Sequence, residues 1–112
     1  MAGWYELRKR SDGQFDFVLK AANSQTILSS EGYSSKNAAL AGIAAVRAAC
    51  AVEERFERRE SRTGEPYFVL KAENYRIIGT SEMYSSIASL ENGIRSVQTN
   101  GPVEAVKDLT EG

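Results

Sequence analysis

The sequence predicts an α+β fold made of two copies of one unit, each with three strands, a helix and a short further strand. Shifting the chain by 51 positions places Phe17–Ala21 on the identical Phe68–Ala72, and Ser30–Ser35 on Ser81–Ser86 with one difference. In each copy, segments with alternating apolar residues, typical of half-buried strands, precede a segment with apolar residues three or four apart, typical of a helix. A motif that recurs at a fixed period is one supersecondary unit repeated.

The two copies are expected to share one hydrophobic core. A chain of 112 residues fits one domain, whereas about fifty residues bury too little of their unfolded surface to be stable alone. We therefore predict a single domain over residues 1–112. Its two repeats are expected at about residues 4–53 and 55–104, with a C-terminal strand at about residues 103–109.

Alternating side chains and turn residues define the predicted strands. In the first repeat, strands are expected at Trp4–Arg10, Phe15–Ala21 and Thr26–Ser30. In the second repeat, they are expected at Val52–Ser61, as one long strand that joins the repeats, and at Pro66–Ala72 and Ile77–Ser81. Gly13 and Gly64 suit the positive φ of hairpin turns. Asn23 and Asn74 are turn residues that also tolerate positive φ.

A serine pair precedes each predicted helix and supplies its N-cap, either Ser34 or Ser35 and either Ser85 or Ser86. The apolar stripes of the two helices are Ala39, Gly42, Ile43 and Val46, and Leu90, Gly93, Ile94 and Val97. Each stripe contains a glycine, which costs about 1 kcal/mol relative to alanine. Because this cost recurs at one place, we expect close helix–sheet contact there. Asn100-Gly101-Pro102 predicts a left-handed cap at the end of the second helix.

The composition excludes several classes of function. The net charge is −1 and the sequence contains no histidine, so the basic footprint of a nucleic-acid binder and imidazole-based catalysis are both missing. The single Cys50 cannot form an internal disulfide and supplies too few ligands for a zinc site. No apolar window is long enough to span a bilayer, and the N-terminus lacks the features of a signal peptide. We therefore expect a cytoplasmic protein with no cofactor, metal or membrane contact.

Several motifs resemble those of the YegP-like family of small bacterial proteins of unknown function. The similarity rests on Phe17–Asn23 (FVLKAAN), Ser30–Lys36 (SEGYSSK) and the helix pattern from Gly42-Ile43 to Val46. It implies tandem β3-α-β repeats that share a single antiparallel sheet, with swapped C-terminal strands and two helices packed on one face. It also implies a fused dimer, so we expect a monomer that is an internal pseudo-dimer. The resemblance implies no activity, substrate or cofactor.

Polar residues that recur at equivalent positions form the first candidate binding surface. Glu6, Arg8 and Lys20 recur as Glu57, Arg59 and Lys71, and strand alternation predicts that all six face away from the helices. Trp4 and Tyr67 are the aromatic residues expected on this outer face. The residues could form a binding surface, or they could be cross-strand charge pairs that contribute about 0.2–1 kcal/mol each. The second interpretation is favoured, because antiparallel sheets often expose one face to water.

Two glutamates just before the helices complete the candidate site. Glu31 and Glu82 could hold the free N–H groups of the first helical turn or favour the positive end of the helix dipole. Alternatively, Glu31 and Tyr33 could mark the rim of a small-ligand pocket. The structural interpretation is favoured, because a glutamate beside a helix N-terminus would compete with an anionic ligand.

None of the usual pairs of nucleophile and base is present, since Ser34 and Ser35 have no base beside them. The sequence therefore favours an uncharacterised non-enzymatic binding or protein-interaction module, with its partner on the polar sheet face or an exposed edge strand. The alternative is a small-ligand or single-stranded nucleic-acid binder that uses Trp4, Tyr67, Arg8 and Lys20 of the outer sheet face. Nucleic acid is the less favoured partner because the net charge is negative.

Overall fold

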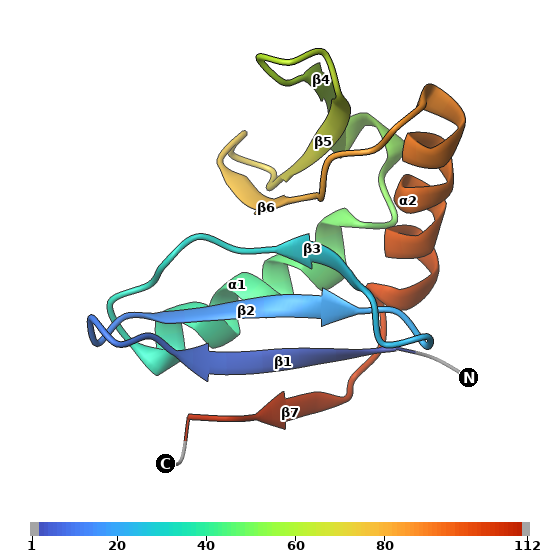
Figure 1. Cartoon of the computed structure of the whole chain (residues 1–112). Coiled ribbons are helices and arrows are strands. Elements are labelled where there is room, and N and C mark those ends of the chain that lie inside the picture. Colours follow the sequence, from blue (N-terminus) through green and yellow to red (C-terminus); the bar gives the residue numbers. More distant parts are fainter. Residues whose placement is uncertain (1–2, 111–112) are drawn as a thin grey trace.

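In the computed structural model, which describes residues 3–110, seven strands form one open sheet and both helices lie on the same face of it (Figure 1). The strand order is β4-β5-β6-β3-β2-β1-β7. The elements are β1 (Trp4–Lys9), β2 (Phe15–Lys20), β3 (Thr26–Ser29), α1 (Lys36–Ala49), the 3₁₀ turn η1 (Glu53–Arg55), β4 (Phe56–Glu60), β5 (Pro66–Lys71), β6 (Ile77–Thr80), α2 (Ile87–Asn100) and β7 (Val106–Asp108). The α+β prediction is confirmed; residues 1–2 and 111–112 of the predicted domain lie outside the described range.

The two repeats meet at the centre of the sheet, where β3 pairs with β6 in antiparallel fashion. Ser29 and Thr80 are the paired residues, and they are also equivalent under the shift that relates the repeats. From this pair the strands run outward in matching order, as β3-β2-β1 on one side and β6-β5-β4 on the other. One continuous cluster of buried residues from both repeats and both helices lies between the sheet and the helices. The repeats therefore share a core, as predicted.

β7 carries the C-terminal end of the second repeat onto β1 of the first, which is the swapped strand that the family resemblance implied (Figure 1). The expectation of a purely antiparallel sheet was wrong at this position, because β7 runs parallel to β1. β7 is also shorter than predicted. The Arg47 guanidinium donates from Nε to the Val103 carbonyl at 2.9 Å and from Nη2 to the Glu104 carbonyl at 3.0 Å. The carbonyls that would extend the strand are therefore bonded to α1.

The predicted strand over Val52–Ser61 was wrong in its first part. η1 precedes β4, with the Arg55 N–H bonded to the Val52 carbonyl at 3.0 Å and the Phe56 N–H bonded to the Glu53 carbonyl. The chain leaves α1 in the helix layer and must change direction before it enters the edge strand of the sheet, which a tight turn allows and a straight extended strand would not. Residues 55–57 match β7 under the repeat shift, but they form this turn and the start of β4.

β4 lies at one edge of the sheet, and ion pairs protect that edge. Arg58, which stands where the first repeat has the buried Leu7, donates to Glu91 of α2 at 2.5 Å and to Glu53 at 3.1 Å. Charged side chains at an edge strand disfavour pairing with another chain. The exposed-edge docking surface proposed from the sequence is therefore less favourable at β4 than the strand order alone suggests.

Replacing Arg58 with leucine is expected to make the chain self-associate, because the variant presents an apolar side chain beside the open backbone edge of β4. Size-exclusion chromatography with light scattering would measure the mass at increasing protein concentration. Arg62→Leu is the matched control, because it removes the same charge from an exposed turn away from the strand. A strictly monomeric Arg58→Leu variant, at concentrations where the wild type is also monomeric, would contradict the protective role.

The predicted caps and turns are largely confirmed. The Ser35 and Ser86 hydroxyls accept from the N–H groups of Ala38 and Ser89. Gly13 and Gly64 adopt φ values of 86° and 90°. In the β2–β3 and β5–β6 hairpins, however, positive φ falls on Ser24 and Tyr75 and not on the asparagines before them, whose side-chain oxygens instead accept backbone N–H groups two residues later.

The left-handed cap predicted at Gly101 was wrong, since this residue has φ −57° and ψ −36°. Glycine is needed there for close approach. A Cβ at this position would lie 2.5 Å from the Cys50 Sγ atom, so the ends of the two helices could not pack as they do. The Tyr5 hydroxyl donates to the Gly101 carbonyl at 2.7 Å and fixes this junction to β1.

Candidate functional site

The outer face of the sheet holds the polar residues that the sequence singled out. A single row crosses six adjacent strands and β7, in the order Lys107, Glu6, Val18, Ser29, Thr80, Val69 and Glu57. Its members on the two halves are equivalent under the repeat shift, with Lys107 as the exception. Val18 and Val69 are buried although they do not belong to the helix-side core. The long polar side chains around them therefore cover a small apolar strip.

In the second repeat, the candidate residues of the outer face pair with one another. Glu57 accepts from Arg59 and from the Lys71 ammonium, the latter at 2.6 Å. These hydrogen bonds, first from Lys71 and then from Arg59, lower the pKa of the Glu57 carboxyl. Tyr67 stands directly opposite Arg59 on the neighbouring strand. Cross-strand pairing accounts for these charges without a ligand.

The first repeat arranges the equivalent residues differently. The Trp4 indole N–H donates to Glu6 at 2.9 Å, and the Lys107 ammonium lies 5.3 Å from the centroid of the Trp4 ring. Among the described residues, Lys20 and Glu6 form no ion pair, whereas their equivalents Lys71 and Glu57 do. The two copies of the predicted surface are therefore not equivalent sites.

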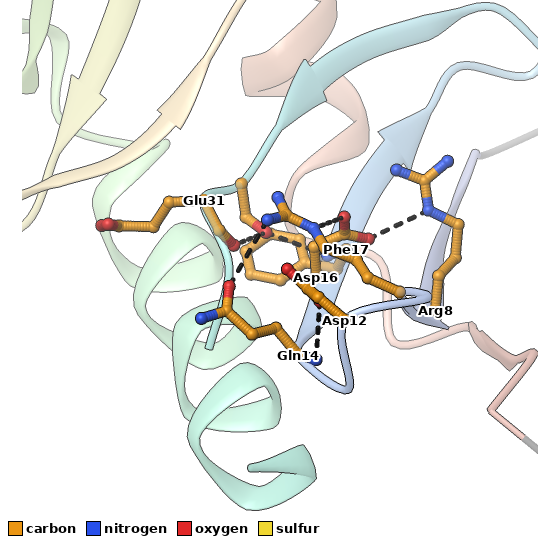
Figure 2. A network of polar contacts seen from close by, with 8 residues as sticks. Arg8, Asp12, Gln14, Asp16, Phe17 and Glu31 are labelled. Atoms are coloured by element: carbon orange, nitrogen blue, oxygen red, sulfur yellow. Dashed lines mark hydrogen bonds and ion pairs between the residues drawn. The ribbon is translucent and has the colours of Figure 1, made fainter. Parts of the chain in front are cut away.

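Asp16 is the centre of the polar network in the first repeat, and the sequence-based analysis did not select it (Figure 2). Arg8 donates to one carboxylate oxygen at 3.0 Å and Arg10 to the other at 2.8 Å, while the carboxylate itself is about nine-tenths buried. Burial opposes ionisation of Asp16, but the hydrogen bonds from Arg10 and Arg8 outweigh this cost and lower its pKa. Arg8 is therefore committed to an intramolecular contact.

Asp16→Asn is expected to lower the free energy of unfolding by about 1–2 kcal/mol at pH 7, because the variant loses two charge-assisted hydrogen bonds to partly exposed arginines. The pKa of Asp16 is lower in the folded state than the ordinary value of about 3.9. Its contribution is therefore present above that value and lost as the pH falls through the folded-state pKa. Urea unfolding should show a difference that shrinks between about pH 4 and pH 2. Glu54→Gln is the exposed control, and a difference independent of pH would refute the assignment.

Trp4 and Tyr67 do not form one stacking platform. Trp4 lies on β1 and Tyr67 on β5, with β2, β3 and β6 between them. At about 4.8 Å per strand, the two rings are on strands about 19 Å apart, and the charges between them are largely paired. Successive bases of a single strand would need aromatic side chains much closer together, so the outer face gives little support to nucleic-acid binding.

The glutamates before the helices do not cap them. Ser35 and Ser86 accept the capping bonds, as the serine pairs predicted, and neither helix has an acidic residue in its first turn. The repeated serines next to the glutamates have the structural role: the Ser30 and Ser81 hydroxyls accept the N–H groups of β2 and β5 at 2.9 Å. Figure 2 shows the Glu31 carboxylate extending away from this network.

Glu31 and Tyr33 line a groove between α1 and the β5–β6 hairpin of the other repeat, in agreement with the pocket alternative. The groove has two adjoining sections of about 300 and 400 Å³ that share Ala45 and Ala72. We call it the α1 groove. Its floor is Ala38, Ala41, Ala45 and Ala48 of α1, and its opposite wall is Ala72, Ile77 and Ile78. The floor of the α1 groove is therefore almost entirely apolar.

An equivalent groove, the α2 groove, lies between α2 and the β2–β3 hairpin and has a volume of about 200 Å³. The repeat shift maps its lining onto that of the α1 groove position by position. Ser89, Asn92 and Ser96 replace the first three alanines of the floor. In the hairpin, Gln25 stands where the α1 groove has Arg76. Only one of the two equivalent grooves is therefore apolar.

Charged side chains flank the α1 groove at both ends. Glu31 and Arg76 line the section near the start of α1, and Arg55 and Glu73 line the section near its end. No ion pair involves any of these four among the described residues, whereas Asp16 and Glu57 of the outer face each pair with two basic side chains. Glu31 and Arg76 both act on the Tyr33 phenol, whose pKa is raised by burial first and by Glu31 second, with Arg76 opposing.

Tyr75 lies at the tip of the β5–β6 hairpin, between two residues that line the α1 groove. Its side chain is 78% exposed and its backbone has φ 68°, a conformation that is unfavourable for a bulky residue. Ile77 in the same hairpin is 36% exposed. The corresponding positions of the first repeat are Ser24 and Thr26. The hairpin beside the α1 groove therefore exposes apolar side chains where the hairpin beside the α2 groove has polar ones.

Sequence reasoning identified only Glu31 and Tyr33 at the α1 groove and missed the rest of its lining, because its walls come from different repeats. Comparison of the two copies could have found it, since Ala38, Ala41 and Ala45 differ in polarity from their equivalents on α2. Within residues 3–110, no three histidine, cysteine, aspartate or glutamate side chains are grouped so that they could hold a metal ion. No helix in the same range is long and apolar enough to cross a membrane.

The shared sheet, the swapped strand and the paired grooves define a tandem-repeat α+β module. A protein-family model described as "Domain of unknown function (DUF1508)" matches residues 11–57 and again residues 61–108. The chain belongs to this family. The two matches correspond to the two repeats, and the first match ends inside β4.

Two relatives match over nearly their whole length. The UPF0339 protein YegP of Escherichia coli K12 is 54% identical over 110 residues, which covers 98% of this chain and 100% of the relative. A UPF0339 protein of Shewanella oneidensis is 51% identical with the same coverage.

Solution NMR structures of two related proteins have the same fold. That of yegP from E. coli, described as a protein of unknown function, has a TM-score of 0.95 and covers 100% of this chain and 97% of its own. That of the UPF0339 protein SO3888 from Shewanella oneidensis has a TM-score of 0.93 and covers 98% and 93%. The predicted family and fold are confirmed, and these descriptions assign no activity.

Proposed function

We propose that the protein is a non-enzymatic protein-interaction module that binds a segment of a partner in the α1 groove. The observation that carries this proposal is the contrast between the two equivalent grooves. Their positions are related by the repeat, but only the α1 groove combines an apolar floor, exposed apolar side chains at its rim and charges without ion pairs. Interfaces are enriched in tyrosine and arginine, and Tyr75 and Arg76 stand where the other hairpin has Ser24 and Gln25.

The absence of catalytic activity is part of the proposal and rests on how the reactive groups are used. The Ser35 hydroxyl caps α1. Cys50 is buried, and burial raises the pKa of its thiol, which disfavours the reactive thiolate. The grooves are open and shallow in comparison with the enclosed sites that usually hold small substrates. Such a shape suits a surface that binds a peptide better than it suits an active site that encloses a small substrate.

We further propose that the module acts in the cytoplasm as a monomer. A buried, unpaired cysteine suits a reducing compartment. The fused repeat already supplies the second copy that a single-repeat protein would need, and ion pairs cover the free edge of β4.

Selection from a displayed random-peptide library tests the proposal directly. We expect wild-type protein to enrich peptides whose binding shifts the amide NMR signals of Ala38, Ala41, Ala45 and Ala72. The variant Tyr75→Ser/Ile77→Thr carries the first repeat's residues at the hairpin tip, so it should fold normally and bind the selected peptides at least about tenfold more weakly, as expected when interface anchors are lost.

The matched control is Ser24→Tyr/Thr26→Ile, which places the same residues on the other hairpin and should leave binding at the α1 groove unchanged. Enriched peptides whose shifts lie on the outer sheet face would refute the assignment of the site. A thermal-shift screen against metabolites tests the enzymatic alternative, since a small ligand that raises the melting temperature would favour it.

A further inference from the structure

The shape of the α1 groove favours an extended occupant. Its two adjoining sections follow α1 from Ala38 to Ala48, and Ile77 and Ile78 form an apolar wall opposite the first section. An extended segment can lie along such a floor with alternate side chains directed into it.

The alanine floor sets the length of that segment. Ala38 and Ala48 are ten residues apart on α1, which corresponds to about 15 Å at 1.5 Å per residue. An extended chain advances about 3.3 Å per residue, so about five residues span the floor. Small or medium apolar side chains suit it, since alanine leaves a shallow surface along its whole length.

The charges at the two ends of the groove determine which charges the ends of the bound segment carry. Glu31 and Arg76 flank one end, and Arg55 and Glu73 flank the other. A segment end with a single sign of charge is attracted by one of the two side chains and repelled by the other. An end that carries one acidic and one basic residue can satisfy both.

We propose that the α1 groove binds an extended, net-neutral peptide segment of about five small or apolar residues, with one acidic and one basic residue at each end. This inference rests on the proposed function and specifies its partner. The apolar centre contacts the alanine floor, and the mixed-charge ends pair with the four charges that have no ion pair among residues 3–110.

A panel of blocked synthetic peptides tests this inference by NMR titration and calorimetry. All share the centre Ala-Val-Ala-Val-Ala, and their ends are Glu-Lys on both sides, Glu-Glu on both sides, Lys-Lys on both sides or Gln-Gln on both sides. We expect the mixed-charge peptide to bind about tenfold more tightly than the other three, as the sum of several exposed charge contacts. Its advantage should decrease in high salt.

Glu31→Gln/Arg76→Gln should reduce the affinity for the mixed-charge peptide several-fold and leave that for the Gln-Gln peptide unchanged. Glu82→Gln, which alters the equivalent of Glu31 outside the groove, is the control and should change neither. Equal binding of all four peptides, or no binding of the mixed-charge peptide, would overturn the inference. If library-selected peptides still occupy the α1 groove in that case, only this specificity fails; if no peptide does, the proposed function fails with it.

Discussion

Replacing Leu28 with alanine is expected to lower the free energy of unfolding by about 2–5 kcal/mol, the usual cost of emptying a fully buried leucine site. Leu28 is 0% exposed and lies near the axis that relates the repeats. Its equivalent is Gly79, where an added Cβ would lie 2.6 Å from Leu28 Cγ. The two copies have thus diverged in a complementary way: one supplies the side chain and the other the space. Urea unfolding at constant m would measure the loss.

The close packing of Leu28 against Gly79 leads to a second, more specific prediction. Gly79→Ala alone should destabilise the protein by about 1–3 kcal/mol through overpacking. In the Leu28→Ala background the same change should cost much less or recover stability, because the space is then free. Additive effects of the two substitutions would show that the residues are not coupled and would contradict the assigned packing.

Replacing Gly42 with alanine is expected to destabilise the protein by about 1–3 kcal/mol, although alanine is the better helix former. A Cβ at Gly42 would lie 2.5 Å from the Tyr33 hydroxyl oxygen and 2.9 Å from Phe17 Cε2. The Tyr33 ring stacks on Phe17 with centroids 6.2 Å apart, so it has limited freedom to move. The glycine is therefore required by the close contact that the sequence predicted.

Thermal unfolding of Gly42→Ala with and without Tyr33→Phe separates this clash from helix propensity. Removing the hydroxyl should restore part of the lost stability, because it eliminates the nearest of the clashing atoms. Gly93→Ala should behave in the same way, since its Cβ would meet the equivalent Tyr84 hydroxyl. A Gly42→Ala protein that is about 1 kcal/mol more stable than wild type, as propensity alone predicts, would refute the packing argument.

Local patterns predicted most elements because they depend on neighbours in the chain. Alternation identified β2 and β5, the serine pairs identified the helix starts, and the turn glycines have the expected positive φ. Partners that are distant in sequence were less predictable. The late start of β7 reflects Arg47, which bonds the carbonyls before it, and the need for glycine at position 101 reflects the nearby Cys50 side chain.

The candidate site illustrates the same limit. Repetition drew attention to the outer face, where Glu57, Arg59 and Lys71 pair with one another. Surface residues that recur at equivalent positions are those that stabilise the fold shared by the two repeats. Residues that differ between otherwise equivalent positions are more informative, and Ala41 against Asn92 and Tyr75 against Ser24 both concern the α1 groove. The apolar patterns that predict strands and helices do not indicate where a groove forms between the repeats.

The most direct test of the α1 groove as the binding surface exchanges the floors of the two grooves. Isothermal titration of one library-selected peptide should be compared for the variant Ala38→Ser/Ala41→Asn/Ala45→Ser and for its counterpart Ser89→Ala/Asn92→Ala/Ser96→Ala. Each variant carries residues that the equivalent helix already accommodates, so both should fold. We predict that the first loses affinity at least about tenfold, as for loss of an apolar interface centre, and that the second binds like wild type. Equal affinity of the two variants would contradict the central claim.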